Sequence, residues 1–139
     1  MIKHPVLVCV TAQSSCQSII AKGRQTAFSS AAALEVVSVQ PVDMEPSERA
    51  LSLDTLYKLS KDSGAQIVVY YNDDAAQTIA LHARRAGARH IILGQSGTYN
   101  HFAYKLSELL PNVTMTVVGK NACYQLERSN ATASRLAES

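Results

Sequence analysis

The stretch NDDAAQTIALHARRAGARHIILG, residues 72–94, decides the fold because it places one clear helix directly before one clear strand. Its first part begins with acidic residues, carries small and aliphatic residues at helical spacing, and ends with two arginines before Gly87. Acids at the start, bases near the end and a closing glycine are typical of an α-helix. HIILG is short, apolar and rich in isoleucine, as expected of a buried strand. We therefore predict a helix over 72–87 and a strand over 90–94.

The same alternation of strand and helix runs through most of the chain. Continuous β-branched runs predict buried strands, and the longer stretches between them have apolar residues at helical spacing. Such alternation indicates right-handed crossovers between strands, hence an α/β three-layer sandwich with a mainly parallel, five-stranded sheet. The last strand is expected to form an edge of the sheet. The predicted strands are 5–11, 34–40, 66–71, 90–94 and 113–119, and the predicted helices are 14–32, 49–64, 72–87 and 100–110.

The pattern stops after residue 119. Residues 120–139 are polar and rich in Ser and Ala, which suits a frayed helix, a linker or a disordered tail. A chain of 139 residues suits one domain. We therefore expect a folded domain over 1–119 and a C-terminal tail or linker over 120–139.

Composition excludes several classes of function. The net charge is +2 and the basic residues are scattered, so no surface for nucleic acid is expected. No apolar run reaches twenty residues and no basic-then-apolar leader opens the chain, so neither a membrane span nor a signal peptide is expected. The three cysteines are odd in number and lack metal-ligand spacing, which favours free thiols in a reducing cytoplasm.

The loops that follow the strands hold the candidate site, because ligands of an open parallel sheet bind outside the carboxyl ends of its strands. The fourth of these loops, GQSGTYNHF, has two glycines that permit close backbone approach and positive φ. Its free N–H groups would form an anion nest that leads into a helix. Alternatively, the first glycine simply ends the strand and the second turns the chain. The candidate ligand-binding residues in this loop are Gly94, Ser96, Gly97, Thr98 and His101.

Catalytic and metal sites find little support in the sequence. Asp73 and Asp74 could bind Mg²⁺, but as acids at a helix start they are better explained as helix caps. His82 and His90 have no Cys or carboxylate at ligand spacing, which favours structural or solvated roles. No nucleophile elbow surrounds Ser14 and Ser15. We expect no metal site and no enzyme activity.

The order of these segments carries a resemblance to a known family. The opening VLVCVT, the run LEVVSVQP, the segment ARRAGARHIILGQSG and the closing VTMTVVG together resemble the universal stress protein family. The likeness spans about residues 3–119 and is nearest to the stress-protein-like domain of Kdp-type, potassium-responsive sensor kinases. It implies a Rossmann-like α/β domain with a five-stranded parallel sheet of strand order 3-2-1-4-5. It also implies a cytoplasmic domain in signalling or stress response, and a homodimer formed through strand five.

The resemblance also implies a nucleotide-type ligand, with departures from the family pattern. ATP-binding members carry G-x-x-G, nine residues, and then Gly followed by Ser or Thr. Gly94 and Gly97 match the first half, whereas a count of nine residues leads to Ser107 and Glu108. Members that bind phosphate also tend to carry Asp after strand one, where Thr11 stands here.

Some of the sensor-kinase domains resemble receptors for cyclic di-AMP, which is held near the strand-one serines and the end of strand two. Ser14, Ser15 and Gln40 occupy those places, although no complete motif matches. The expected function is therefore a regulatory domain that binds ATP, AMP or cyclic di-AMP. The alternatives are a non-binding dimerisation module of the same fold and a weak nucleotide hydrolase.

Overall fold

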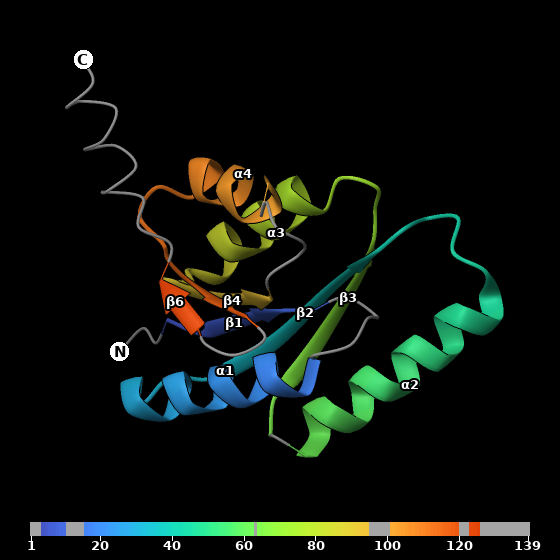
Figure 1. The fold of residues 1–139 in the computed structure, drawn as a ribbon, viewed down its shortest axis with the longest axis horizontal. Coiled ribbons are helices and arrows are strands. Elements are labelled where there is room, and N and C mark those ends of the chain that lie inside the picture. Colours follow the sequence, from blue (N-terminus) through green and yellow to red (C-terminus); the bar gives the residue numbers. More distant parts are fainter. Residues whose placement is uncertain (1–3, 11–15, 63, 95–100, 120–122, 126–139) are drawn as a thin grey trace.

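The computed structural model describes residues 4–10, 16–62, 64–94, 101–119 and 123–125. They form a three-layer sandwich in which helices cover both faces of one central sheet (Figure 1). The predicted α/β class is confirmed. The strands are β1 Val6–Cys9, β2 Leu34–Gln40, β3 Gln66–Tyr71, β4 His90–Gly94, β5 Thr114–Val118 and β6 Cys123–Gln125, and the helices are α1 Cys16–Ser30, α2 Pro46–Asp62, α3 Ala75–Ala86 and α4 His101–Leu109.

The sheet has the order β3-β2-β1-β4-β5-β6. Its first five strands run parallel, so the predicted order 3-2-1-4-5 is confirmed. β1 lies in the middle, where Val8 pairs with Val36 on one side and Ile92 on the other. Because β1 has helices above and below and strands on both sides, all four of its side chains are buried.

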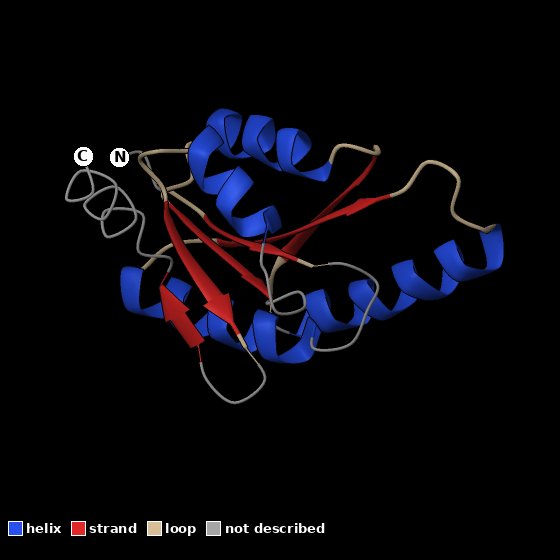
Figure 2. Cartoon of the chain, turned by 45° about the horizontal axis from the view of Figure 1, so that its top comes forward, coloured by secondary structure: helices blue, strands red, loops and turns tan. Residues whose placement is uncertain are grey.

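The prediction that strand five forms a sheet edge is wrong. β6 pairs antiparallel with β5, with Val117 opposite Tyr124, and so continues the sheet past residue 119 (Figure 2). An edge strand exposes unpaired N–H and C=O groups, and a short added strand covers them. The free edge through which a homodimer was expected is therefore occupied by the chain itself.

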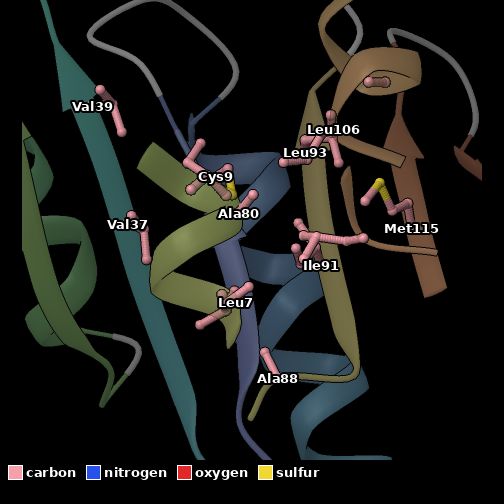
Figure 3. Close-up of a cluster of buried hydrophobic side chains, with 14 of the residues drawn as sticks. Leu7, Cys9, Val37, Val39, Ala80, Ala88, Ile91, Leu93, Leu106 and Met115 are labelled. Atoms are coloured by element: carbon pink, nitrogen blue, oxygen red, sulfur yellow. The ribbon is translucent and has the colours of Figure 1, made fainter. Parts of the chain in front are cut away.

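The two faces of the sheet carry separate hydrophobic cores. α3 and α4 cover one face and α1 and α2 the other (Figure 2). Alternate residues of each strand point to opposite faces, so Leu7 and Val37 enter the first core while Val8 and Val36 enter the second. Figure 3 shows the first core, in which Ala80 of α3 and Leu106 of α4 pack onto Leu7, Ile91 and Leu93.

Two features set the positions of the helices. A Cβ on Gly23 of α1 would lie 2.1 Å from Cγ2 of Val8, so the missing side chain lets α1 pack closely onto β1. α3 begins at an Asp74 cap whose side chain accepts from the amide of Gln77, and it ends at Gly87 with φ of 70°. The cap at Asp74 and the end at Gly87 were predicted, because a short acid and a glycine satisfy the free groups of a helix, but the helix begins at Ala75 rather than at residue 72.

α2 begins earlier than the sequence predicts, at Pro46 rather than residue 49. Proline suits the first turn of a helix, because its missing N–H group would have no partner there. In the part of the chain that the structure describes, no helix is long and apolar enough to cross a membrane.

Candidate functional site

The winding of the sheet reverses between β1 and β4. The chain leaves β1 toward α1 on one face and leaves β4 toward α4 on the other, while the two strands lie parallel with Cys9 opposite Leu93 (Figure 1). This is the position at which open α/β sheets form a ligand crevice. The carboxyl ends of β1 and β4 are therefore neighbours, as the candidate site requires.

Most of the predicted ligand-binding residues belong to the two loops that leave these strands. Of the loop after β1, Thr11, Ser14 and Ser15 lie outside the described residues, and so do Ser96, Gly97 and Thr98 of the loop after β4. His101 is the first residue of α4, and only its place in that helix is described. The structure thus positions Gln40, Gly94 and the start of α4 among the predicted site residues.

Gly94 ends β4 opposite Val118 and packs closely against α1. A Cβ at this position would lie 2.7 Å from Cδ1 of Ile19, so the glycine makes room for that side chain. Positive φ was expected to be one use of this glycine, but the described glycines that adopt it are Gly64 and Gly87. The absence of a side chain at Gly94 therefore lets α1 pack closely against the end of β4.

Gln40, the last residue of β2, is the clearest polar feature at the carboxyl edge of the sheet. Its side chain is buried, with the residue 1% exposed, and its Nε2 donates to Oγ of Ser52 on α2 at 3.1 Å. Its Oε1 and the Oγ of Ser38, two residues earlier on the same face, have no hydrogen-bond partner among the described residues. Buried polar atoms are rarely left unpaired, because each costs about 1–3 kcal/mol. An unpaired buried acceptor here is the kind of atom that a ligand donor would satisfy.

Arg49 of α2 ties the strand ends beside Gln40 together. Its Nη2 donates to the carbonyl of Val42 at 2.8 Å, and its guanidinium lies over the ring of Tyr71 at 4.5 Å from the centroid. The amide of Val42 donates in turn to Oδ1 of Asp73 at 3.3 Å. These bonds join the loop after β2 to the loop after β3. The ring of Tyr71 is thus in contact with the Arg49 guanidinium.

The acids after β3 act in local structure. Asp74 caps α3, as predicted, and Asp73 holds the backbone of Val42. Among the described residues, no group of three His, Cys, Asp or Glu side chains is placed to hold a metal ion.

The residues that stand where the ATP pattern would place its second Gly and Ser or Thr do not lie at the crevice. α4 begins at His101, so Ser107 and Glu108 lie near its end. There the carbonyl of Leu109 accepts from Arg84 at the end of α3, at the amino edge of the sheet. Ser107 is buried and donates to the carbonyl of Tyr104 at 2.7 Å. Glu108 therefore does not face the crevice.

The described cavities lie away from the carboxyl edge between β1 and β4. Those of about 480 and 640 Å³ open at the amino edge, one beside Leu34 and Gln66 and the other beside Ala88 and Val113. The loops that would wall the crevice are not among the described residues. We therefore place the candidate site by topology and by Gln40 rather than by cavity volume.

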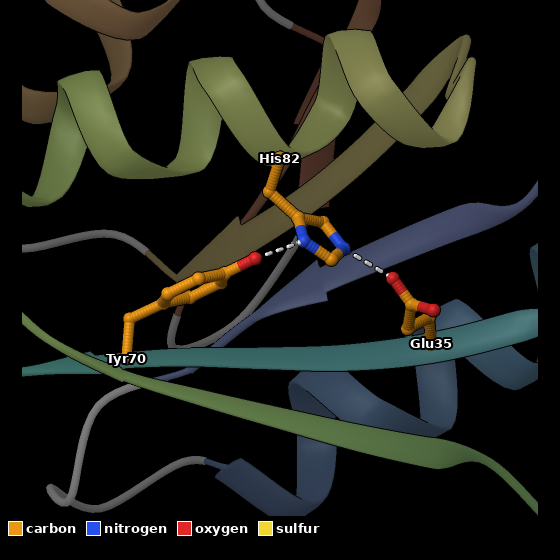
Figure 4. Close-up of polar contacts among 3 residues, drawn as sticks. All are labelled: Glu35, Tyr70 and His82. Carbon is orange, nitrogen blue, oxygen red and sulfur yellow. Dashed lines mark hydrogen bonds and ion pairs between the residues drawn. The ribbon is translucent and has the colours of Figure 1, made fainter.

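One cluster of polar side chains was not predicted from the sequence, in which no carboxylate stands at ligand spacing from His82. His82 of α3 contacts both Glu35 of β2 and Tyr70 of β3 (Figure 4). Its Nδ1 lies 2.6 Å from the Tyr70 hydroxyl, and its Nε2 lies within hydrogen-bond distance of Oε1 of Glu35. Glu35 and His82 are 47 residues apart, so no local spacing could reveal the pair. The available signal was an acid inside an otherwise buried strand.

Two groups outside this cluster, Cys9 and His90, have shifted pKa values. Burial raises the pKa of the Cys9 thiol to about 12, which makes it an unreactive core residue. Burial, and then the positive charge of Lys22, lower the pKa of His90, whose Nε2 lies 2.8 Å from the Thr116 hydroxyl.

Several solved structures that are similar to this chain are universal stress proteins. One from Archaeoglobus fulgidus has a TM-score of 0.68 at 16% identity, covering 86% of this chain and 94% of its own. UspA from Lactobacillus plantarum has the same TM-score and identity, covering 84% and 98%. The fold is that of the universal stress proteins.

Two of the similar structures hold adenine nucleotides. The Archaeoglobus fulgidus protein in complex with dAMP has a TM-score of 0.63 at 16% identity, covering 86% of this chain and 98% of its own. A universal stress protein in complex with cAMP has a TM-score of 0.61 at 13% identity, with coverage of 86% and 98%. No protein-family model matches the sequence, and a search of the curated proteins found no match.

Proposed function

We propose that this chain is a non-catalytic regulatory domain that binds an adenine nucleotide or cyclic di-AMP at the carboxyl ends of β1 and β4. The observation that carries the proposal is the buried Gln40, whose Oε1 lacks a hydrogen-bond partner among the described residues at that edge of the sheet. An exocyclic amino group of adenine is a donor that such an acceptor would hold. The complexes of similar folds with dAMP and cAMP support this class of ligand.

The two parts of the proposed site differ in chemistry and would bind different parts of the ligand. Gln40 would recognise the base, while the loop 95–100 and the start of α4 would supply N–H groups to a phosphate. Thr11, Ser14, Ser15, Ser96, Thr98 and His101 complete the proposed ligand set. A cytoplasmic location and a signalling role like that of the Kdp-type sensor-kinase domain belong to the same proposal.

The second candidate function is a non-binding interaction module. Exposed apolar side chains on the face of α1 and α2 favour it: Phe28 is 88% exposed and Leu51 70%. Exposed large apolar groups commonly mark contacts with other proteins. The homodimer stays a prediction, although the strand-five edge expected for it is covered by β6.

A thermal-shift series with AMP, ATP and cyclic di-AMP separates the two functions. A ligand that binds only the folded state raises its melting temperature. The regulatory proposal predicts a saturable rise with at least one of the three. No rise with any of them at millimolar concentration would leave the interaction module as the better account.

A further inference from the structure

The cluster of Glu35, His82 and Tyr70 lies apart from the proposed nucleotide site. Glu35 stands near the amino end of β2, and Tyr70 stands on β3, the outermost strand on the far side from β4. α3 crosses above them and directs His82 down between the two strands (Figure 4). The side chains of His82 and Glu35 are 13% and 18% exposed, so the pair is largely removed from water.

The chemistry of the three groups indicates which atoms donate and which accept in the two hydrogen bonds of the cluster. An ionised carboxylate only accepts hydrogen bonds, so Nε2 of His82 carries the proton that faces Glu35. In the neutral imidazole the other nitrogen then has the lone pair, and the Tyr70 hydroxyl donates to it. A hydroxyl, a base that receives its proton and a carboxylate that orients the base are the parts of an activated nucleophile.

The cluster is also reached by a cavity. A cavity of about 260 Å³ is lined by Tyr70 and His82, with Arg85 one turn further along α3 on its wall. A small molecule in this cavity would meet Tyr70, its base His82, the positive charge of Arg85 and the negative charge of Asp74. Arg85 lies in the last turn of α3 and Asp74 before its first, so the guanidinium favours a donor whose negative charge lies at the Arg85 end of the cavity.

We propose that Tyr70 is a base-activated nucleophile that accepts an acyl group from a small activated acyl donor, with acyl phosphates as the preferred class. The phenol oxygen attacks the acyl carbon and forms an ester, while the bond from that carbon to the leaving group breaks. The phenol proton passes to Nδ1 of His82 and then to solvent, and the leaving group departs with the bonding electron pair. Glu35 holds the imidazole in place and stabilises its positive charge. The product is a singly modified protein, which is a function beyond nucleotide binding.

The competing role for the cluster is purely structural, and the two roles predict opposite reactivities. Tyr57 and Tyr104 are 56% and 47% exposed, whereas Tyr70 is partly buried. If access alone governed reaction, Tyr57 and Tyr104 would be acylated first and Tyr70 would be protected. If His82 activates Tyr70, the partly buried residue reacts first.

Acetylation of the 139-residue chain by N-acetylimidazole and by acetyl phosphate, mapped by peptide mass spectrometry, tests the proposal. We expect Tyr70 to gain an acetyl group about tenfold faster than Tyr57 or Tyr104, as general-base assistance allows. His82→Gln, which keeps a polar side chain without a base, should abolish this advantage and leave Tyr57 and Tyr104 unchanged. Arg85→Gln should slow the acetylation of Tyr70 by acetyl phosphate but not its acetylation by the neutral N-acetylimidazole.

Glu35→Gln keeps the shape of the cluster and serves as the second variant if His82→Gln does not fold, as judged by circular dichroism. It should slow acetylation of Tyr70 alone. The proposal is overturned if Tyr70 reacts more slowly than both exposed tyrosines in the unaltered protein. It is equally overturned if a folded His82→Gln or Glu35→Gln variant acetylates Tyr70 at the original rate or faster.

Discussion

At the scale of single residues, close packing assigns glycines that sequence alone left ambiguous. Gly94 fitted both a phosphate cradle and a strand end, and the structure uses it to admit Ile19 of α1. Gly23 has the same role at the centre of the fold, where α1 meets Val8. Neither role depends on positive φ.

Gly23→Ala should destabilise the protein by about 1–2 kcal/mol in urea unfolding. The added Cβ would overlap a side chain of the central strand that is 0% exposed, which costs about 1–3 kcal/mol, and the gain in helix propensity offsets only part of that cost. Gln25→Ala on the exposed face of α1 is the matched control and should change stability little. A stabilised Gly23→Ala protein would show that α1 is not seated on β1 in this way.

His90 should make the protein less stable as the medium becomes acidic. Its folded-state pKa is lowered by burial and then by Lys22, so the unfolded chain takes up the proton first as the pH falls through the ordinary value of 6.5. Stability is therefore retained above that pH and lost below it. Urea unfolding at pH 7 and pH 5 should show a smaller loss for His90→Gln than for the unaltered protein. Equal losses in the two proteins would contradict this assignment.

At the scale of elements, the sequence predicts three of the strands and the position of α3 well. β2, β3 and β4 have the predicted bounds, because runs rich in β-branched or aliphatic residues end sharply at polar or turn residues. β6 was not predicted, because Cys123–Gln125 has no periodic pattern and is held by pairing with β5. The Glu35 and His82 pair was likewise beyond the sequence, since it exists only once α3 lies over β2.

The cap of α3 should be measurable. Asp74→Ala removes the bond to the Gln77 amide and should lower stability by about 1 kcal/mol. Asp54→Ala, which removes an exposed ion pair with Lys58, should lower it by less than about half of that amount. Equal losses in the two variants would mean that the Asp74 bond does not cap the helix in solution.

The short strand β6 should keep the sheet from pairing with other molecules. A chain ending at residue 119 would leave β5 unpaired on its outer side and should self-associate more strongly than a chain ending at residue 125. Sedimentation velocity of both shortened chains and of the 139-residue chain checks this and the predicted homodimer together. Identical association of the two shortened chains would show that β6 does not protect the edge.

At the scale of the whole molecule, the fold places the proposed nucleotide site and the acyl-acceptor cluster in different regions. The first lies where the winding reverses between β1 and β4, and the second lies under α3 at the β3 side of the sheet. Topology could be predicted from the sequence because it follows from the alternation of strands and helices. The ligand could not, because fold alone does not determine chemistry.

Gln40 offers the most direct test of the proposed function, through equilibrium dialysis of the adenine ligand that gives the largest thermal shift. Gln40→Met keeps the volume of the side chain and removes its acceptor, whereas Gln66→Met makes the same change at the exposed amino end of β3. We predict that Gln40→Met weakens binding about tenfold, consistent with the loss of one buried hydrogen bond, and that Gln66→Met leaves it unchanged. Equal affinity in a folded Gln40→Met protein and in the unaltered protein would contradict the assignment of the site to the carboxyl edge beside β2.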